Sequence, residues 1–337
     1  MNTIHRFLIP HSSFLIQGKC LLAFSHGLDS TALYHLLAES GIDFDIALVN
    51  YGIREQADVE EAAARELAER DGRRIFVAYA SRWESDFEAQ ARKFRYDFFE
   101  SLIEERGYEN LLTAHQLNDR LEWMLMRLLR GAGTVELAGM EAVSERQTLR
   151  GKSYRLIRPL LETPRHELED YLRERKLSWF YDVSNESDTF ERNRLRPFLE
   201  MLIREHSPGI RRTFEYLKQD TKLLSENYEE IYAEGKLRIY RIHDRRIVPL
   251  AASKALKELG YLLGGMERKM LQEKKSIVAG RKWAIELSGE YLYLAPYVTE
   301  APMTKSFKEA CRLRNIPMKI RPWLYRSGID PGTLPIP

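Results

Sequence analysis

The sequence predicts an α/β protein in which a doubly wound parallel sheet is followed by a helical linker and a small α+β C-terminal domain. Three observations lead to this fold class. Apolar strand-like runs alternate with helical patterns through the first half of the chain, a long helical pattern follows, and strand-like segments return near residue 237. A length of 337 residues favours two domains. We expect a first domain over 1–205, a helical linker over 206–236 and a basic domain over 237–337.

The first domain has four apolar runs that are typical of buried strands. The predicted strands are 21–24, 44–50, 74–79 and 110–114, and the helical patterns between and after them are 30–40, 55–70, 84–106 and 118–130. Such alternation indicates a parallel sheet whose ligands bind beyond the carboxyl ends of the strands. The segments 25–30, 50–51 and 114–115 should therefore meet at one edge of the sheet.

The later elements follow from the same patterns. An extended stretch or short hairpin is expected over 149–161. Helices are expected over 164–176 and 188–235, the second interrupted at Pro208 and Gly209. The last domain should contain a helix over 251–273. The strands expected around it are 237–242, 283–287 and 291–294.

Composition excludes several classes of protein. The apolar fraction of 44% and the charged fraction of 30% are those of a soluble globular protein. No apolar run approaches the length of a transmembrane helix, and the first ten residues lack the pattern of a secretory signal. The two cysteines, Cys20 and Cys311, form neither a zinc motif nor a disulfide framework. We therefore expect a protein of the reducing cytoplasm with no membrane partner.

The loop that follows the first strand is the most informative feature. Ser25, Gly27, Asp29 and Ser30 stand where a buried strand ends and a helix begins, a position that favours anion binding. The loop is neither G-x-x-x-x-G-K-[ST] nor G-x-G-x-x-G. Its S-x-G-x-D-S pattern resembles the S-G-G-x-D-S loop of the N-type ATP pyrophosphatases, with His26 in place of the first glycine. That resemblance implies an adenine nucleotide alpha hydrolase-like fold and cleavage of ATP between the α and β phosphates.

Asp29 and His115 carry two interpretations each. Asp29 is either an N-cap or, together with Asp119 at another strand end, a ligand of Mg²⁺. His115 is either a structural hydrogen-bonding residue or a catalytic group at the same sheet edge.

Two basic segments are also open to two interpretations. Arg92 and Arg95 share a helical face with Glu88 and Tyr96, which suits either surface ion pairs or phosphate binding. Residues 305–326 carry seven Lys or Arg residues against Glu309 alone. Interleaved aromatic and proline residues favour a folded basic surface that binds a phosphate backbone over a solvated basic face.

Together these segments resemble one family, the tRNA(Ile)-lysidine synthases. The resemblance covers about 250 residues and is most specific in the segments 130–140 and 182–196. The matching motifs are Arg130-Gly131-Ala132-Gly133 with Leu137-Ala138-Gly139-Met140, Arg158-Pro159-Leu160-Leu161, Arg165–Leu172, Asp182-Val183-Ser184-Asn185, Arg192-Asn193-Arg194-Leu195-Arg196 and, more loosely, Ile316-Pro317 with Arg321-Pro322-Trp323.

The resemblance implies a two-step ligation. ATP adenylates the carbonyl oxygen at carbon 2 of the wobble cytidine in tRNA(Ile) with a CAU anticodon, and the amine of free L-lysine then displaces AMP. It also implies Mg²⁺, an N-type ATP pyrophosphatase domain over 1–205 and a tRNA-binding domain over 237–337. The base that deprotonates lysine is not identified, and a homodimer is left open.

The same resemblance assigns roles by position. The implied catalytic residues are Asp29, His115, Asp119 and Arg192, and the implied metal ligands are Asp29 and Asp119. The implied ATP-binding residues are Ser25, His26, Gly27, Leu28, Asp29, Ser30 and Asn50. The implied tRNA- or nucleotide-binding residues are Arg92, Arg95, Arg130, Arg196, Lys319 and Arg321. Besides His26, the departures from the family pattern are Tyr51 for histidine, Asn118 for aspartate and Arg120 for glutamine.

Two other functions remain as alternatives. A tRNA thiolase of the same superfamily would use paired cysteines for sulfur chemistry, which two distant cysteines do not provide. A tRNA-binding protein with a decayed ATP site would keep the basic surface, and His26 is its main support. Amidotransferase-type relatives lack the 182–196 signature.

Overall fold

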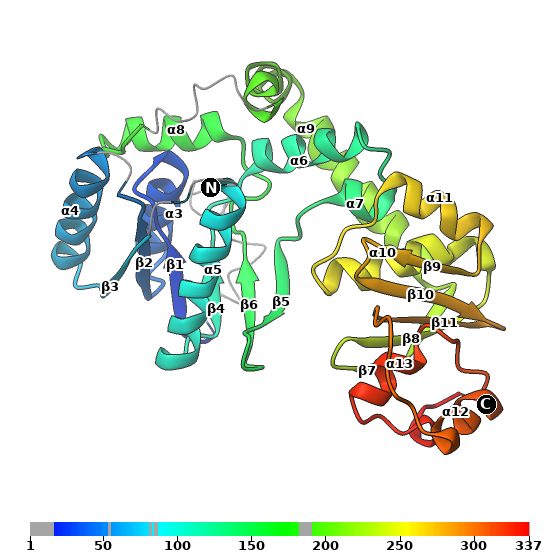
Figure 1. The fold of residues 1–337 in the computed structure, drawn as a ribbon. Coiled ribbons are helices and arrows are strands. Elements are labelled where there is room, and N and C mark those ends of the chain that lie inside the picture. Colours follow the sequence, from blue (N-terminus) through cyan, green and yellow to red (C-terminus); the bar gives the residue numbers. More distant parts are fainter. Residues whose placement is uncertain (1–16, 53–54, 81–82, 84–86, 182–190, 337) are drawn as a thin grey trace. The chain divides into compact units, whose positions relative to one another are not determined.

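The computed structural model describes residues 17–52, 55–80, 83, 87–181 and 191–336. The chain divides into two compact units (Figure 1). The first unit comprises residues 1–122 and 140–211, and the second comprises residues 123–139 and 212–337. The segment 123–139 therefore belongs with the C-terminal part of the chain, although it lies within the first predicted domain. The predicted boundaries at 205 and 237 stay a prediction.

The first unit is built on a mixed sheet with strand order β3-β2-β1-β4-β6-β5. The strands are β1 (Cys20–Ala23), β2 (Phe44–Asn50), β3 (Ile75–Tyr79), β4 (Asn110–Leu112), β5 (Val143–Gln147) and β6 (Ser153–Ile157). Neighbouring strands run parallel except β5 and β6, which form a hairpin. Strand order reverses between β1 and β4, which is where open α/β sheets bind ligands. The predicted fold class is confirmed.

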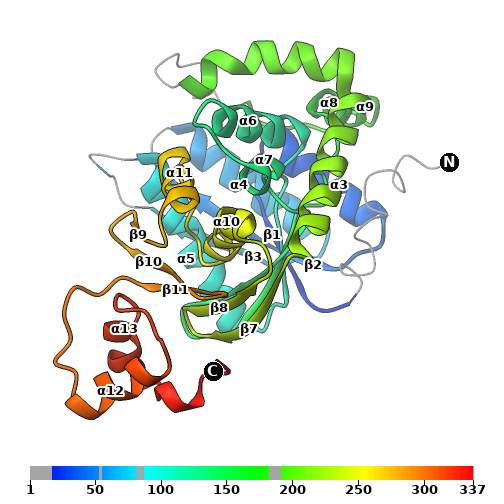
Figure 2. The ribbon, with the colours of Figure 1, turned by 90° about the vertical axis from the view of Figure 1, so that its right-hand side faces the viewer.

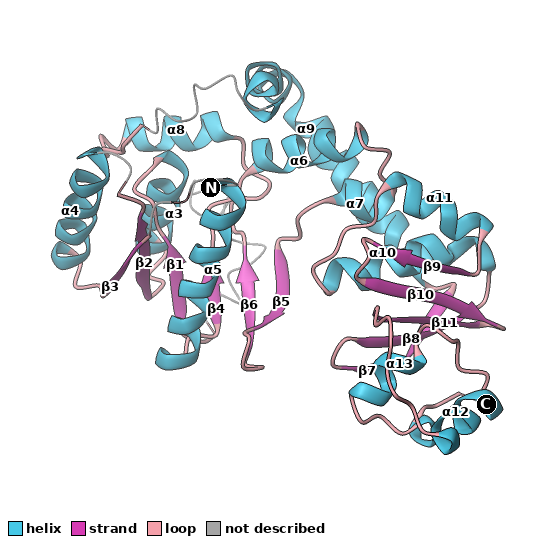
Figure 3. Ribbon diagram, in the orientation of Figure 1, coloured by secondary structure: helices cyan, strands magenta, loops and turns pink. Residues whose placement is uncertain are grey.

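Helices cover both faces of this sheet (Figure 3). They are α3 (Leu28–Glu39), α4 (Glu55–Arg70), α5 (Phe87–Arg106) and α8 (Arg165–Glu174). Two further helices, α6 (Leu117–Leu128) and α9 (Glu191–Ser225), begin in the first unit and continue into the second. Leu22 and Phe24 point to the face that packs against α3, α4 and α8, whereas Leu21 points to the face covered by α5. This period of two explains why β1 is apolar throughout.

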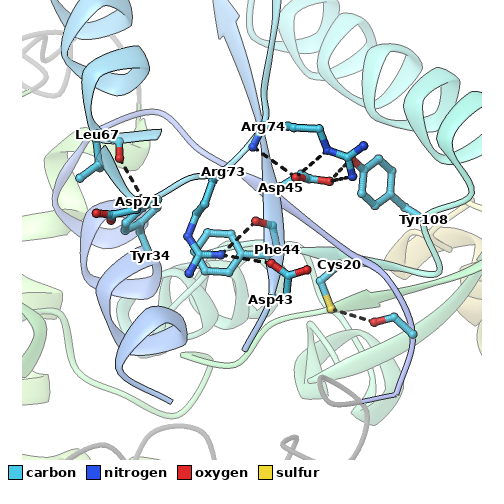
Figure 4. A network of polar contacts seen from close by, with 11 residues as sticks. Cys20, Tyr34, Asp43, Phe44, Asp45, Leu67, Asp71, Arg73, Arg74 and Tyr108 are labelled. Atoms are coloured by element: carbon cyan, nitrogen blue, oxygen red, sulfur yellow. Dashed lines mark hydrogen bonds and ion pairs between the residues drawn. The ribbon is translucent and has the colours of Figure 1, made fainter. Parts of the chain in front are cut away.

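Polar contacts tie together the beginnings of three strands (Figure 4). The Asp45 carboxylate accepts hydrogen bonds from Arg74 Nη2 at 2.6 Å and from the Tyr108 hydroxyl at 2.5 Å. The Arg73 guanidinium lies 3.8 Å from the centroid of the Phe44 ring and donates to the Phe44 carbonyl oxygen. These charges lie at the amino ends of β2, β3 and β4, so the opposite edge of the sheet is left for the loops of the predicted site.

The second unit is an antiparallel sheet with strand order β7-β8-β11-β10-β9, covered by helices on both faces (Figure 2). The strands are β7 (Tyr228–Glu234), β8 (Leu237–Ile242), β9 (Ser276–Ala279), β10 (Trp283–Ser288) and β11 (Tyr291–Pro296). The helices are α7 (Thr134–Ala138), α10 (Val248–Glu258), α11 (Gly265–Glu273), α12 (Lys305–Leu313) and α13 (Arg321–Arg326), with 3-10 turns at Arg245–Ile247 and Pro331–Thr333. α10 and α11 pack on one face with Val135 of α7, and α12 and α13 pack on the other.

Three predicted elements differ from the structure. The hairpin expected over 149–161 begins earlier, at Val143. The helix expected over 188–235 continues through Pro208 and Gly209 without the expected interruption and ends at Ser225. β7 follows because its backbone pairs with β8. The helix expected over 251–273 is two helices, separated at residues 259–264, where Gly260 takes a φ of 81°. No helix of the described part is long and apolar enough to span a bilayer.

Candidate nucleotide and tRNA site

The loop between β1 and α3 has the geometry of an anion site. Gly27 is the N-cap of α3 and, within the described residues, no side chain caps the first turn. The first helical hydrogen bond runs from the Thr31 N–H to the Gly27 carbonyl oxygen at 2.9 Å, so earlier N–H groups of the turn are left for a ligand. The Ser25 and Ser30 hydroxyls lie 3.1 Å apart at the same place. Amides, hydroxyls and the helix dipole thus converge on one point.

His26 takes the backbone conformation that the family's glycine would provide. Its φ is 57°, in the left-handed region that costs most L-residues about 1 kcal/mol. His26 is 7% exposed, and the centroid of its ring lies 5.1 Å from that of Phe24 and 5.0 Å from that of Phe180. The His26 carbonyl oxygen also accepts a hydrogen bond from the Phe180 N–H at 3.0 Å. Buried ring packing offsets the backbone strain, so the substitution preserves the loop. The imidazole itself is turned into the core.

Asp29 lies in the first turn of α3 and is not its N-cap, which corrects the structural interpretation offered by the sequence. Its side chain is 30% exposed, and its Oδ1 atom has no hydrogen-bond partner among the described residues. The nearest cation is Arg165, whose Nε lies 3.8 Å from Oδ1. Burial, together with the nearby Asp119 charge, raises the pKa of Asp29 to about 7. The buried oxygen without a partner in the described chain is what a bound cation would complete.

Asp119 has a structural role at the start of α6. Its Oδ2 atom accepts a hydrogen bond from the Gln116 N–H at 3.0 Å, while the Gln116 side chain accepts one from the Asn118 N–H. This reciprocal pair caps the helix. The Asp119 charge also acts on Asp29, whose pKa it helps to raise.

Asn118 explains one departure from the family pattern. Its Nδ2 atom donates to Glu200 Oε2 at 2.5 Å, and its Oδ1 atom accepts from the Arg165 N–H at 3.1 Å. An aspartate could accept the second hydrogen bond but could not donate the first. The amide therefore joins α6, α8 and α9 at the rim of the site.

His115 follows β4 and is neutral at physiological pH. Burial is the main cause of the lowering of its pKa to about 4, aided by the Arg158, Arg92 and Arg95 charges and opposed by Asp119. Its Nδ1 atom lies 2.9 Å from the Thr113 hydroxyl oxygen. A neutral imidazole can exchange hydrogen bonds or accept a proton, but it supplies no positive charge.

A pocket opens between the β1–α3 loop and the segment before residue 182. Its described lining residues are Ser25, Gly27, Leu28, Asp29, Ser30, Arg165, Trp179, Phe180 and Tyr181. Five of them belong to the predicted ATP-binding loop. Among these described lining residues, Arg165 alone carries a positive charge. The sequence interpretation assigned it no role. The available signal was a basic residue at the first position of a helix that follows a strand end.

The other predicted residues of the first unit lie in different settings. Arg92 and Arg95 are exposed on α5. Arg196 contacts Glu122, with Nε 3.4 Å from Oε2. Asn50 is 3% exposed and its amide bonds Asp58, Glu61 and the Gly52 N–H, so it shapes the loop after β2. Arg192 and the Asp182–Asn185 motif lie outside what the structure describes in side-chain detail.

Tyr51, which replaces the family's histidine, belongs to an aromatic group. Its ring centroid lies 6.3 Å from that of Trp83 and 5.9 Å from that of Phe87. Its hydroxyl is buried without a hydrogen-bond partner in the described part of the chain. The position is therefore mainly apolar here.

The Arg130–Gly133 motif packs within the second unit. A Cβ atom at Gly133 would lie 1.9 Å from Arg268 Nη2, so any larger residue there would displace the Arg268 guanidinium. Arg268 Nη1 in turn pairs with the buried Glu136 carboxylate and donates to the Ser253 hydroxyl at 2.7 Å. Arg268 therefore joins α11 to α7 and α10, while Arg130 itself is exposed.

The C-terminal basic residues are divided between structure and surface. Lys319 Nζ donates to the Ser276 hydroxyl, and Arg321 Nε donates to the Ile316 carbonyl oxygen at 2.8 Å. Both side chains are half-buried, whereas Lys305 and Lys308 are exposed on α12. Part of the charge in this segment therefore holds its own fold together.

The donors suit a magnesium ion bound together with a polyphosphate. The described residues contain no group of three or more His, Cys, Asp or Glu side chains able to hold a metal alone. Mg²⁺ commonly takes only one or two carboxylates, and substrate oxygens complete its coordination. The unpartnered Asp29 oxygen, with Asp119 nearby, fits that pattern.

Comparisons with known proteins show the family to which the chain is similar. A family model described as "PP-loop domain" matches residues 3–202. The tRNA(Ile)-lysidine synthase of Campylobacter jejuni subsp. jejuni serotype O:2 is 40% identical over 328 residues, covering 96% of this chain and 97% of the relative. That of Wolinella succinogenes is 42% identical over 318 residues, covering 94% and 95%.

A solved structure shows the same fold at lower similarity. The U34-tRNA thiolase NcsA from Methanococcus maripaludis superposes with a TM-score of 0.52 and 18% identity, covering 64% of this chain and 76% of the thiolase. That likeness concerns the fold alone. From the matches over nearly its whole length, the chain belongs to the tRNA(Ile)-lysidine synthase family.

Proposed function

We propose that this protein ligates free L-lysine to carbon 2 of the wobble cytidine of tRNA(Ile) with a CAU anticodon, using ATP. The observation that carries the proposal is the β1–α3 loop, where uncapped helix N–H groups lie beside an unpartnered Asp29 oxygen. Full-length similarity to tRNA(Ile)-lysidine synthases supports the substrate assignment.

In the first step, the cytidine O2 atom attacks the α-phosphorus of ATP, and the bond to the β-phosphate oxygen breaks. The electron pair of that bond leaves with pyrophosphate, so negative charge grows at the loop. We propose that the N–H groups of the α3 turn and the Ser25 and Ser30 hydroxyls donate hydrogen bonds to it, supported by the uncapped turn and by the two hydroxyls lying 3.1 Å apart. Asp29 and Asp119 would hold Mg²⁺, which supplies charge neutralisation when bound.

In the second step, the lysine amine attacks carbon 2, the carbon–oxygen bond breaks and AMP leaves. The amine must be neutral to attack, so one proton must leave its ammonium form first. Burial lowers the pKa of His115 to about 4, which favours the neutral imidazole. We propose that this imidazole accepts a proton or exchanges hydrogen bonds at the cytosine ring. Arg92, Arg95, Arg192 and Arg196 remain proposed contacts to the nucleotide or to the RNA.

We propose that the second unit supplies tRNA binding through its basic residues. Lys305 and Lys308 are exposed, and Arg130, Lys319 and Arg321 complete the proposed contacts. Since tRNA modification takes place where tRNA is used, we also propose a cytoplasmic location.

The thiolase alternative finds no support in the cysteines. Cys20 and Cys311 are both buried, and burial raises the pKa of each thiol to about 11. Neither is a reactive thiolate. The alternative of a decayed ATP site loses its main support, because His26 adopts the left-handed geometry of the loop.

ATP–pyrophosphate exchange tests the proposal. We expect exchange with tRNA(Ile) bearing CAU, none without tRNA, and none with the same tRNA whose wobble cytidine is replaced by uridine. Lysine should then be incorporated into the pre-adenylated tRNA without further ATP. An absence of exchange with the correct tRNA in the wild-type protein would refute the enzyme assignment.

A further inference from the structure

We infer that Arg165 is a catalytic cation that binds the leaving pyrophosphate. The inference rests on the proposed function and adds a residue to its ATP site. Arg165 begins α8, outside the sequence motif of the phosphate loop, and reaches the loop through the tertiary fold.

The position of Arg165 suits a phosphate ligand. It lines the pocket together with Ser25, Ser30 and Asp29 and is the cation of the described lining residues. Its Nε atom is buried and has no hydrogen-bond partner among the described residues. The side chain as a whole is 36% exposed. An unpartnered buried donor is costly, which points to a ligand that completes it.

The Asp29 carboxylate, which faces Arg165, also has a buried atom without a hydrogen-bond partner among the described residues. Asp29 Oδ1 lies 3.8 Å from Arg165 Nε, too far for a hydrogen bond, and it too lacks a partner within the described chain. The two groups therefore balance each other's charge without satisfying each other's hydrogen bonds. When ATP enters, the carboxylate can turn to the metal and the guanidinium to a phosphate oxygen.

The backbone of Arg165 is fixed independently of its side chain. Its N–H donates to Asn118 Oδ1 at 3.1 Å, and the Leu117 N–H donates to the Thr163 carbonyl oxygen at 3.0 Å. The amino end of α8 is thereby anchored to that of α6, which also carries Asp119. Such support holds a guanidinium in place for two parallel hydrogen bonds to phosphate.

Arg165 then acts in the first step of the proposed reaction. As the bond between the α-phosphorus and the bridging oxygen breaks, the electron pair moves to the β-phosphate oxygen. The guanidinium donates hydrogen bonds to this oxygen and remains protonated throughout. No proton is transferred by Arg165, and its contribution grows as the charge of the leaving group grows.

Pyrophosphate and AMP dependence test this role. Arg165→Gln should raise the KM for pyrophosphate in the exchange reaction by about 10- to 100-fold, the range for loss of a charged hydrogen bond. Inhibition by AMP and the Kd for tRNA should stay within about twofold, because AMP retains none of the leaving group. Arg165→Lys keeps the charge and loses the fork, so it should recover part of the loss.

Arg173→Gln is the matched control, since Arg173 lies on the same helix, 67% exposed and paired with Glu169. It should behave as wild type. An unchanged KM for pyrophosphate in Arg165→Gln, or equal weakening of pyrophosphate and AMP, would overturn the inference. If Arg165→Gln fails to fold, Arg165→Lys and Arg173→Lys are titrated with magnesium pyrophosphate by calorimetry instead. Weaker binding of pyrophosphate by Arg165→Lys than by Arg173→Lys would support the inference, and equal binding would overturn it. Failure of the proposed function would instead abolish exchange in the wild-type protein.

Discussion

Replacing His26 by the glycine of the family pattern should destabilise the first unit, although it removes backbone strain. The imidazole is 7% exposed between Phe24 and Phe180, and large-to-small changes at buried aromatic sites cost about 3 kcal/mol. Relief of the left-handed conformation at φ 57° returns about 1 kcal/mol. His26→Gly should therefore lose about 2 kcal/mol net, because lost packing outweighs relieved strain.

His26→Ala separates the loss of ring packing from the relief of backbone strain. Alanine loses the ring but keeps the strain, so it should be about 1 kcal/mol less stable than His26→Gly. Two units need not unfold in one step, so the assay is hydrogen exchange of the peptides that cover β1 and α3, read by mass spectrometry. A glycine variant more stable than wild type would refute the packing argument. An alanine variant as stable as the glycine variant would refute the strain argument.

Three further predictions concern charge. Burial lowers the pKa of His26, so as the pH falls the unfolded chain takes up the His26 proton before the folded protein does. The difference in stability between wild type and His26→Gly should therefore become smaller below about pH 6.5 when it is measured by hydrogen exchange. A difference that does not change with pH would contradict this. Asp29→Asn should reduce the rate of ATP–pyrophosphate exchange by at least about 100-fold, while the Kd for tRNA measured by filter binding stays unchanged. Comparable losses of exchange rate and of tRNA affinity would show that Asp29 is not a dedicated metal ligand. The double variant Lys305→Glu, Lys308→Glu should make the slope of log K for tRNA binding against log salt concentration shallower by about 1 to 2. Arg150→Glu, in the turn between β5 and β6, is the control and should leave this slope unchanged. Equal slopes in the wild type and both variants would place the RNA surface elsewhere.

Much of the first unit follows from local sequence pattern. β2 occupies the predicted range, and α4 does too, because apolar alternation and helical periodicity are local signals that long, regular elements carry strongly. The S-x-G-x-D-S loop likewise identifies itself, since a strand end followed by a helix start is encoded within a few residues. Elements that depend on a distant partner were predicted less well. β7 has no clear alternation and becomes a strand by pairing with β8.

The candidate site shows the same division. The sequence alone determined the α/β class, the phosphate loop and the family, because each is carried by residues close together in the chain. Only the tertiary structure decided that His26 is stabilised by Phe180, that Asn118 joins α6 to α8 and α9, and that Arg165 faces Asp29. These contacts join residues between 47 and 154 positions apart. Their energies depend on burial and on the distance between side chains, which the local pattern of a sequence does not specify.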